Sequence, residues 1–73
     1  MNRLILYNDD MHTDAELQEM VWIASGYDEV QCEQLVKLIR IRGHAIVKEG
    51  NIIEELIPML DTMQVDGFKC KIL

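Results

Sequence analysis

Two helix-capping motifs, each followed by a glycine at helical distance, determine how the first half of this chain can fold. A T-x-x-E capping box starts at Thr13, and apolar residues then recur at helical spacing until Gly26. Asp28 begins a second, weaker cap, and the apolar face of that segment extends to Gly43. The sequence therefore predicts two helices joined as a hairpin by a short turn after Gly26.

Three short apolar runs outside this hairpin indicate strands. Residues 3–7 and 44–48 flank the hairpin, and residues 68–73 end the chain. In the last run, strand alternation assigns three residues to the core: Phe68, Cys70 and Ile72. The two lysines between them are expected to face water.

A third helix is expected between the second and third strands. Asn51 with Glu54 resembles another N-cap. An apolar stripe follows, made of Ile53, Leu56, Ile57, Leu60 and Met63. Pro58 lies inside this stripe, where a proline removes a hydrogen bond and costs about 3 kcal/mol. We therefore expect a kink at Pro58.

The resulting order, β-α-α-β-α-β, predicts an α+β fold in which a three-stranded antiparallel sheet packs against three helices. A chain of 73 residues buries only about 60% of the surface that its unfolded form exposes. It can support one domain over residues 1–73 and one core, without a large internal cavity for catalysis. This argues against an enzyme that carries out several steps.

The charge distribution bears on possible partners. The formal net charge is -6, which opposes a general attraction to nucleic acid or anionic lipid. No basic residue lies between Arg3 and Lys37, whereas eight acidic residues do. Positive charge then follows in a cluster: Lys37, Arg40, Arg42 and Lys48. This cluster allows a winged helix-turn-helix that binds DNA as a third hypothesis, although cations are also favoured near any helix C-terminus.

Several common sequence signals are absent from this chain. The longest apolar run is far short of the roughly 18 residues that a membrane span needs, and no secretion signal is recognisable. We therefore expect a cytoplasmic protein that does not associate with membranes. Cys32 and Cys70 lie far apart, which fits neither a zinc-binding pair nor a disulfide scaffold, and both are interpreted as small buried apolar residues.

No catalytic constellation is evident. Ser25 is the only serine, and no histidine accompanies it in the sequence. One group combines carboxylates with an imidazole and could in principle hold a metal: Asp9, Asp10, His12 and Asp14. Its spacing fits no calcium loop, and a solvated acidic turn that caps a helix is the favoured interpretation. We expect no catalytic activity, no metal and no cofactor.

The chain nevertheless resembles a known family over nearly its whole length. The matching segments are L-I-L-Y-N-D-D at residues 4–10, Tyr-Asp at 27–28, Gln-Leu at 34–35, Gly-His-Ala-Ile at 43–46, and the last strand at 68–73. They are similar to ClpS, the adaptor of bacterial AAA+ Clp proteases, and the N-D-D exit from the first strand is the most specific element. The resemblance implies a compact ClpS-like α/β domain.

It also implies a function without catalysis. ClpS proteins bury a bulky N-terminal side chain of an N-degron (Leu, Phe, Tyr or Trp) in an apolar pocket. They hold the free α-amino group with polar groups, and they hand the substrate to an ATPase of the ClpA or ClpC type. The expected partners are therefore N-degron proteins and the N-terminal domain of such an ATPase, and the domain is expected to act as a monomer.

Residue by residue, the resemblance places amine binding at Asn8 and Asp9, with Asp10 shaping the same loop. Arg40 falls where the family has a histidine that contacts the amine. The corresponding pocket-wall positions are His12, Asp14, Leu17, Met20, Val36 and Ile39. The apolar members of this set could equally be ordinary helix core, since their spacing fits both interpretations.

Two of these positions depart from the family pattern. Arg40 replaces the histidine, and Asp14 replaces a methionine that acts as a gate. The two charged residues could pair with each other, or they could redirect specificity toward a different N-terminus. We also expect a domain without the family's usual mobile N-terminal extension, which the protease engages during delivery.

The leading hypothesis from the sequence is thus a divergent N-degron adaptor that docks on a Clp ATPase. The alternative is an interaction module with the same fold but with lost or altered degron specificity, which acts as a competitor or as an adaptor for other sequences.

Overall fold

The computed structural model describes residues 1–73, with helices and strands in the predicted order. Their bounds are β1 (Asn2–Tyr7), α1 (Asp14–Ser25), α2 (Glu29–Arg42), β2 (His44–Gly50), α3 (Ile57–Val65) and β3 (Cys70–Ile72). The α+β architecture with three helices and three strands is confirmed.

Strand β1 is the centre of the sheet. The strand order is β2-β1-β3, and both neighbours pair with β1 in the antiparallel sense. Pairing continues beyond β3, because the backbones of Arg3 and Leu73 exchange two hydrogen bonds of 2.8 Å. At the other end, the Tyr7 N–H donates to the Lys69 carbonyl at 2.8 Å. The end of β1 therefore lies beside the beginning of β3, which positions the candidate site.

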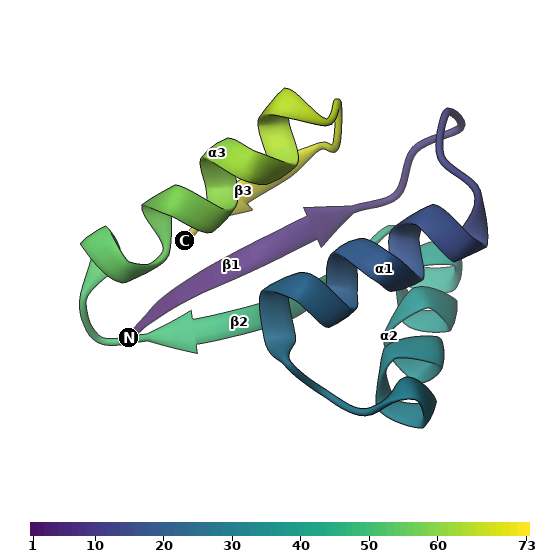
Figure 1. The fold of residues 1–73 in the computed structure, drawn as a ribbon, viewed down its shortest axis with the longest axis horizontal. Coiled ribbons are helices and arrows are strands. Elements are labelled where there is room, and N and C mark those ends of the chain that lie inside the picture. Colours follow the sequence, from purple (N-terminus) through teal and green to yellow (C-terminus); the bar gives the residue numbers. More distant parts are fainter.

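The core joins one face of the sheet to all three helices. It contains Leu4, Leu6, Leu17, Met20, Val21, Ala24, Cys32, Val36, Ile39, Ala45, Val47, Met63 and Phe68. Helices α1 and α2 form the predicted hairpin, and α3 runs along β3 (Figure 1). The predicted alternation in the last strand is confirmed, since Cys70 and Ile72 pack against this core while Lys69 and Lys71 are exposed.

Both predicted helix caps of the hairpin are present. The Thr13 hydroxyl accepts from the Glu16 N–H at 3.1 Å, and the Glu16 carboxylate accepts from the Thr13 N–H at 2.8 Å. Asp28 caps α2 in the same way. Gly26 and Gly43 end the two helices with φ values of 71° and 95°, in the left-handed region that favours glycine. Local signals therefore account for the whole hairpin.

The expected start of the third helix was wrong. A 3-10 turn occupies residues 53–55, Leu56 is the N-cap, and α3 begins only at Ile57. Pro58 therefore lies in the first turn, where its missing N–H has no intrahelical partner to lose, and no kink is needed. Asn51 caps no helix.

This later start changes the apolar stripe. Leu56 and Met63 are fully buried and Leu60 is half-buried, as expected for a core-facing position. Ile53 and Ile57, however, are 41% and 40% exposed. The 3-10 turn rotates the chain ahead of α3, so the helical period cannot be extended back to Ile53, while Ile57 is the first residue of α3.

Two other sequence-based expectations concern cysteine and membranes. Cys32 is 1% exposed, Cys70 is half-buried, and both thiols are free. None of the three helices has both the length and the apolar character that crossing a bilayer would require.

Candidate functional site

The loop that leaves β1 is built around the buried side chain of Asp9. Its residue is only 5% exposed, and one carboxylate oxygen accepts hydrogen bonds of 2.8 Å from the backbone N–H groups of Met11 and His12. Such an Asx turn folds the chain back on itself directly after the strand. The preceding residue, Asn8, donates its backbone N–H to the Gly43 carbonyl at 2.8 Å, which ties the loop to the end of α2.

His12 is held between two acceptors. Its Nδ1 lies 2.8 Å from the second carboxylate oxygen of Asp9, and its Nε2 lies 3.0 Å from the Asp66 carbonyl oxygen. Neither a carboxylate nor a carbonyl can donate, so both bonds form together only when both ring nitrogens carry protons. The geometry therefore favours the imidazolium form of His12.

The directions in which the pKa values of Asp9 and His12 are shifted agree with that geometry. The hydrogen bond to Asp9 raises the pKa of His12 above its ordinary value of 6.5, against the opposing effect of burial. Burial alone would raise the pKa of Asp9, but hydrogen bonds from the His12 side chain and from two backbone N–H groups hold this pKa below 3.8. The geometry and both pKa shifts therefore favour the charged forms of Asp9 and His12.

Phe68 covers this ion pair from the opposite end of the chain. Its ring stacks on the His12 imidazole with the two centroids 3.7 Å apart and the planes inclined by 13°. A cationic ring over an aromatic face gains electrostatic attraction in addition to the apolar contact. Neither Phe68 nor Asp66 is predicted from the sequence as part of the site. Only the pairing of β1 with β3 brings them to His12.

Arg40, in the last turn of α2, donates four hydrogen bonds to the same loop. Its Nε bonds to an Asp14 carboxylate oxygen at 2.8 Å, and one Nη bonds to the side-chain oxygen of Asn8 at 2.7 Å. The same Nη reaches the Asp9 carbonyl at 2.8 Å, and the other Nη reaches the His12 carbonyl at 2.6 Å. Of the two alternatives that the sequence left open for these charges, the pairing of Arg40 with Asp14 is present in the structure.

These bonds use the polar groups that the resemblance assigns to a substrate amine. The oxygen of Asn8 accepts from Arg40, and the carboxylate of Asp9 accepts from His12 and from two backbone N–H groups. Asp10 is exposed and its side chain joins none of these bonds. Arg40 thus contributes a cationic group of its own at the position expected for the α-ammonium.

The apolar positions of the expected pocket wall lie in the core. Leu17 and Ile39 are fully buried, and Met20 and Val36 are 4% and 5% exposed. Met20 lines a surface cavity of about 320 Å³ that it shares with His12, Glu16, Glu19, Ile23, Asp66 and Phe68. In this conformation all four residues act as helix core.

The geometry of the remaining candidate groups matches neither a metal site nor a serine nucleophile. No three His, Cys, Asp or Glu side chains come together as a potential metal site. Ser25 donates its hydroxyl to the Val21 carbonyl at 2.6 Å, one turn earlier in α1, so this hydroxyl serves the helix end. In the basic cluster, Arg40 is committed to the loop, which leaves Lys37 and Arg42 as the exposed cations of α2.

No known family model matches this chain, and no curated protein does either. The relation to the ClpS family stays a prediction that rests on the matching segments of the sequence.

Proposed function

We propose that this chain is a protein-interaction domain without catalysis, with a ClpS-like architecture whose amine-binding position is occupied by its own Arg40. The observation that carries the proposal is the set of four hydrogen bonds from the Arg40 guanidinium to Asn8, Asp9, His12 and Asp14. In this proposal the domain binds a Clp-type ATPase and acts as a competitor, or as an adaptor for sequences other than N-degrons.

A substrate amine would have to displace the guanidinium of Arg40 from its hydrogen bonds. An incoming α-ammonium needs acceptors, and the Asn8 side-chain oxygen already has a charged donor at 2.7 Å. Moving Arg40 aside would break bonds to two backbone carbonyls as well as to two side chains. A charged hydrogen bond contributes roughly 1.5–3 kcal/mol, so this exchange opposes binding of the amine.

The N-degron adaptor remains the second candidate, because one observation favours it. Asn8, Asp9 and Asp14 do lie together around one point of the loop, and the side chain of Arg40 is 29% exposed. That function requires Arg40 to swing outward when a peptide arrives, which leaves its guanidinium in solvent.

A panel of peptides that differ only in their first residue separates the two candidates. Each peptide carries a fluorophore at its C-terminus, and fluorescence polarisation reports binding to the chain. The proposal predicts a flat profile across Leu, Phe, Tyr, Trp and Ala at the first position. In parallel, the N-terminal domain of a ClpA- or ClpC-type ATPase is expected to co-purify with the chain.

Two results would contradict the proposal. A sharp preference for bulky first residues that disappears on N-acetylation would support the N-degron adaptor instead. Failure to bind any Clp N-terminal domain, together with a flat peptide profile, would remove the connection to Clp proteases.

A further inference from the structure

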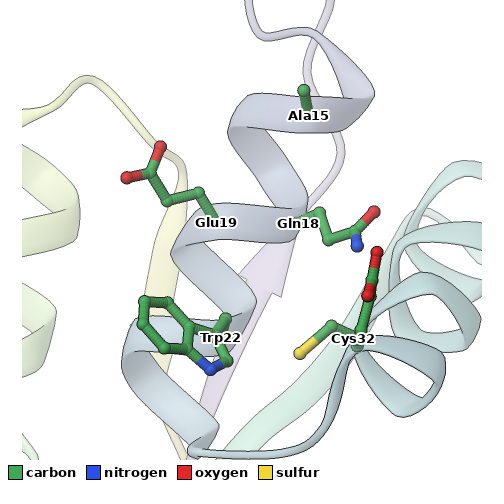
Figure 2. A pocket seen from close by; sticks show the side chains of 6 residues that line it. Ala15, Gln18, Glu19, Trp22 and Cys32 are labelled. Atoms are coloured by element: carbon green, nitrogen blue, oxygen red, sulfur yellow. The ribbon is translucent and has the colours of Figure 1, made fainter.

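A second surface of the molecule, on the outer side of the helical hairpin, has the character of a binding groove. It encloses about 420 Å³ between α1 and α2 and is lined by Ala15, Gln18, Glu19, Trp22, Glu29 and Cys32. Trp22 and Glu19 project from α1, and the Cys32 sulfur points from α2 toward the indole (Figure 2). This groove has an apolar floor and acidic sides.

The aromatic side of the groove is open to solvent. Trp22, the only tryptophan of the chain, is 58% exposed. Cys32 beneath it is 1% exposed and closes the groove toward the core. A ligand side chain that entered the groove would therefore contact the indole ring of Trp22 and the buried Cys32.

The charge of the groove is not neutralised by the protein itself. The three ion pairs of the molecule are Arg3–Glu49, His12–Asp9 and Arg40–Asp14. Glu19 and Glu29 belong to none of them, and both are exposed. None of the six residues that line the groove is basic, so the lining itself supplies no cation.

We propose that this groove binds an arginine or lysine side chain from a basic segment of a partner protein. The cation would lie over the indole of Trp22, which attracts positive charge through its ring quadrupole, with Glu19 and Glu29 on either side. The aliphatic stem of the same side chain would cover Cys32 and Ala15. An acidic or neutral segment gains neither interaction, so charge determines the choice of partner.

This proposal goes beyond the function of the Arg40 loop and can be tested apart from it. The probe is an amphipathic peptide of about 15 residues, built of leucine and arginine and acetylated at its N-terminus so that it has no free amine. A peptide with glutamate in place of arginine serves as the comparison. Binding is followed by the fluorescence of Trp22 and, for variants without it, by calorimetry.

The expected result is saturable binding of the arginine peptide with a change in Trp22 emission, and no binding of the glutamate peptide. Trp22→Ala and the double variant Glu19→Gln/Glu29→Gln are each expected to weaken binding by about tenfold or more. The matched control is Glu54→Gln/Asp61→Asn, which removes the same charge from two exposed positions outside the groove. It is expected to change affinity by less than about threefold, with circular dichroism confirming that every variant is folded.

Three outcomes would overturn the proposal. Equal weakening by the control and the groove double variant would assign the effect to net charge. Equal binding of the arginine and glutamate peptides would exclude recognition of a cation. Absence of any emission change at peptide concentrations up to about 1 mM would show that the groove does not bind.

Discussion

At the scale of single residues, Arg40 connects the end of α2 to the loop after β1. A guanidinium presents five donors in a planar fork, so it can reach two side chains and two backbone carbonyls at once. A lysine at this position could not satisfy the same set. The location in the last turn of α2 adds the attraction of the helix dipole for a cation.

The ion pair of Asp9 and His12 predicts how stability depends on pH. The pKa of His12 is raised above 6.5 in the folded state, so its stabilisation is complete below 6.5 and is lost as pH rises through the folded pKa. The pKa of Asp9 is lowered below 3.8, so its stabilisation is present above 3.8 and is lost as pH falls through the folded pKa. We expect the free energy of unfolding from urea titrations to be greatest between these two values.

Two histidine variants test the assignment of the decline at higher pH. His12→Gln should remove the decline above 6.5, because a neutral amide does not titrate there. His44→Gln, at the other histidine of the chain, should leave the decline in place. The same slope in the wild type and in His12→Gln would refute the role given to this ion pair.

The sequence predicted only part of this residue-scale arrangement. The N-D-D exit and the pairing of Asp14 with Arg40 could be proposed from residue types at matching positions. The stacking of Phe68 on His12 could not, because the two residues lie far apart in the chain and no local pattern links them. Their contact follows from the register of β1 against β3.

At the scale of elements, the helical hairpin has strong local signals and α3 has weak ones. Both hairpin helices have a capping box and a left-handed glycine, so propensity, cap and apolar period agree. Helix α3 has no side-chain cap, and its start follows from Pro58 and from the burial of Leu56. Because burial depends on the rest of the fold, the start of α3 that was predicted from the sequence came too early.

The glycine that ends α1 gives a prediction about stability. Gly26 has a φ of 71° and no atom within 4 Å of an added Cβ, so alanine there meets no clash and suffers only the backbone penalty. We expect Gly26→Ala to lower the free energy of unfolding by about 1 to 2 kcal/mol in urea titrations.

Gly50 supplies the matched control, because its φ lies outside the left-handed region and an added Cβ would contact Leu56 at an ordinary 3.7 Å. Gly50→Ala should leave stability unchanged or raise it by up to about 1 kcal/mol. If both alanine variants lose the same stability, the conformational role of Gly26 is wrong.

At the scale of the whole molecule, the antiparallel sheet determines where function can lie. The sheet places the exit of β1 between the end of α2 and the beginning of β3, and the Arg40 site forms where these three segments meet. The acidic groove lies between α1 and α2 (Figure 2). The molecule thus presents two surfaces of different chemistry. In the first, the cation Arg40 is bonded to groups of the protein itself, and in the second, Glu19 and Glu29 form no ion pair.

The overall architecture was predictable because every local signal agreed with the same order of elements. The occupation of the candidate amine site by Arg40 could not be predicted, because it depends on the distances between Arg40 and four groups of a distant loop. Charge at positions 14 and 40 indicated a departure from the family pattern. The structure shows the physical consequence of that departure, which is the bond from Arg40 to the side-chain oxygen of Asn8.

The central claim, that Arg40 occupies the position proposed for a substrate amine, is tested most directly by Arg40→His, which introduces the histidine that ClpS proteins have at the matching position. The measurement compares the affinity of one peptide with an N-terminal leucine in its free and N-acetylated forms, for the wild type and for Arg40→His. The account predicts no discrimination by the wild type and a preference of about tenfold or more for the free amine in Arg40→His. A wild-type chain that already prefers the free amine by that factor would contradict it.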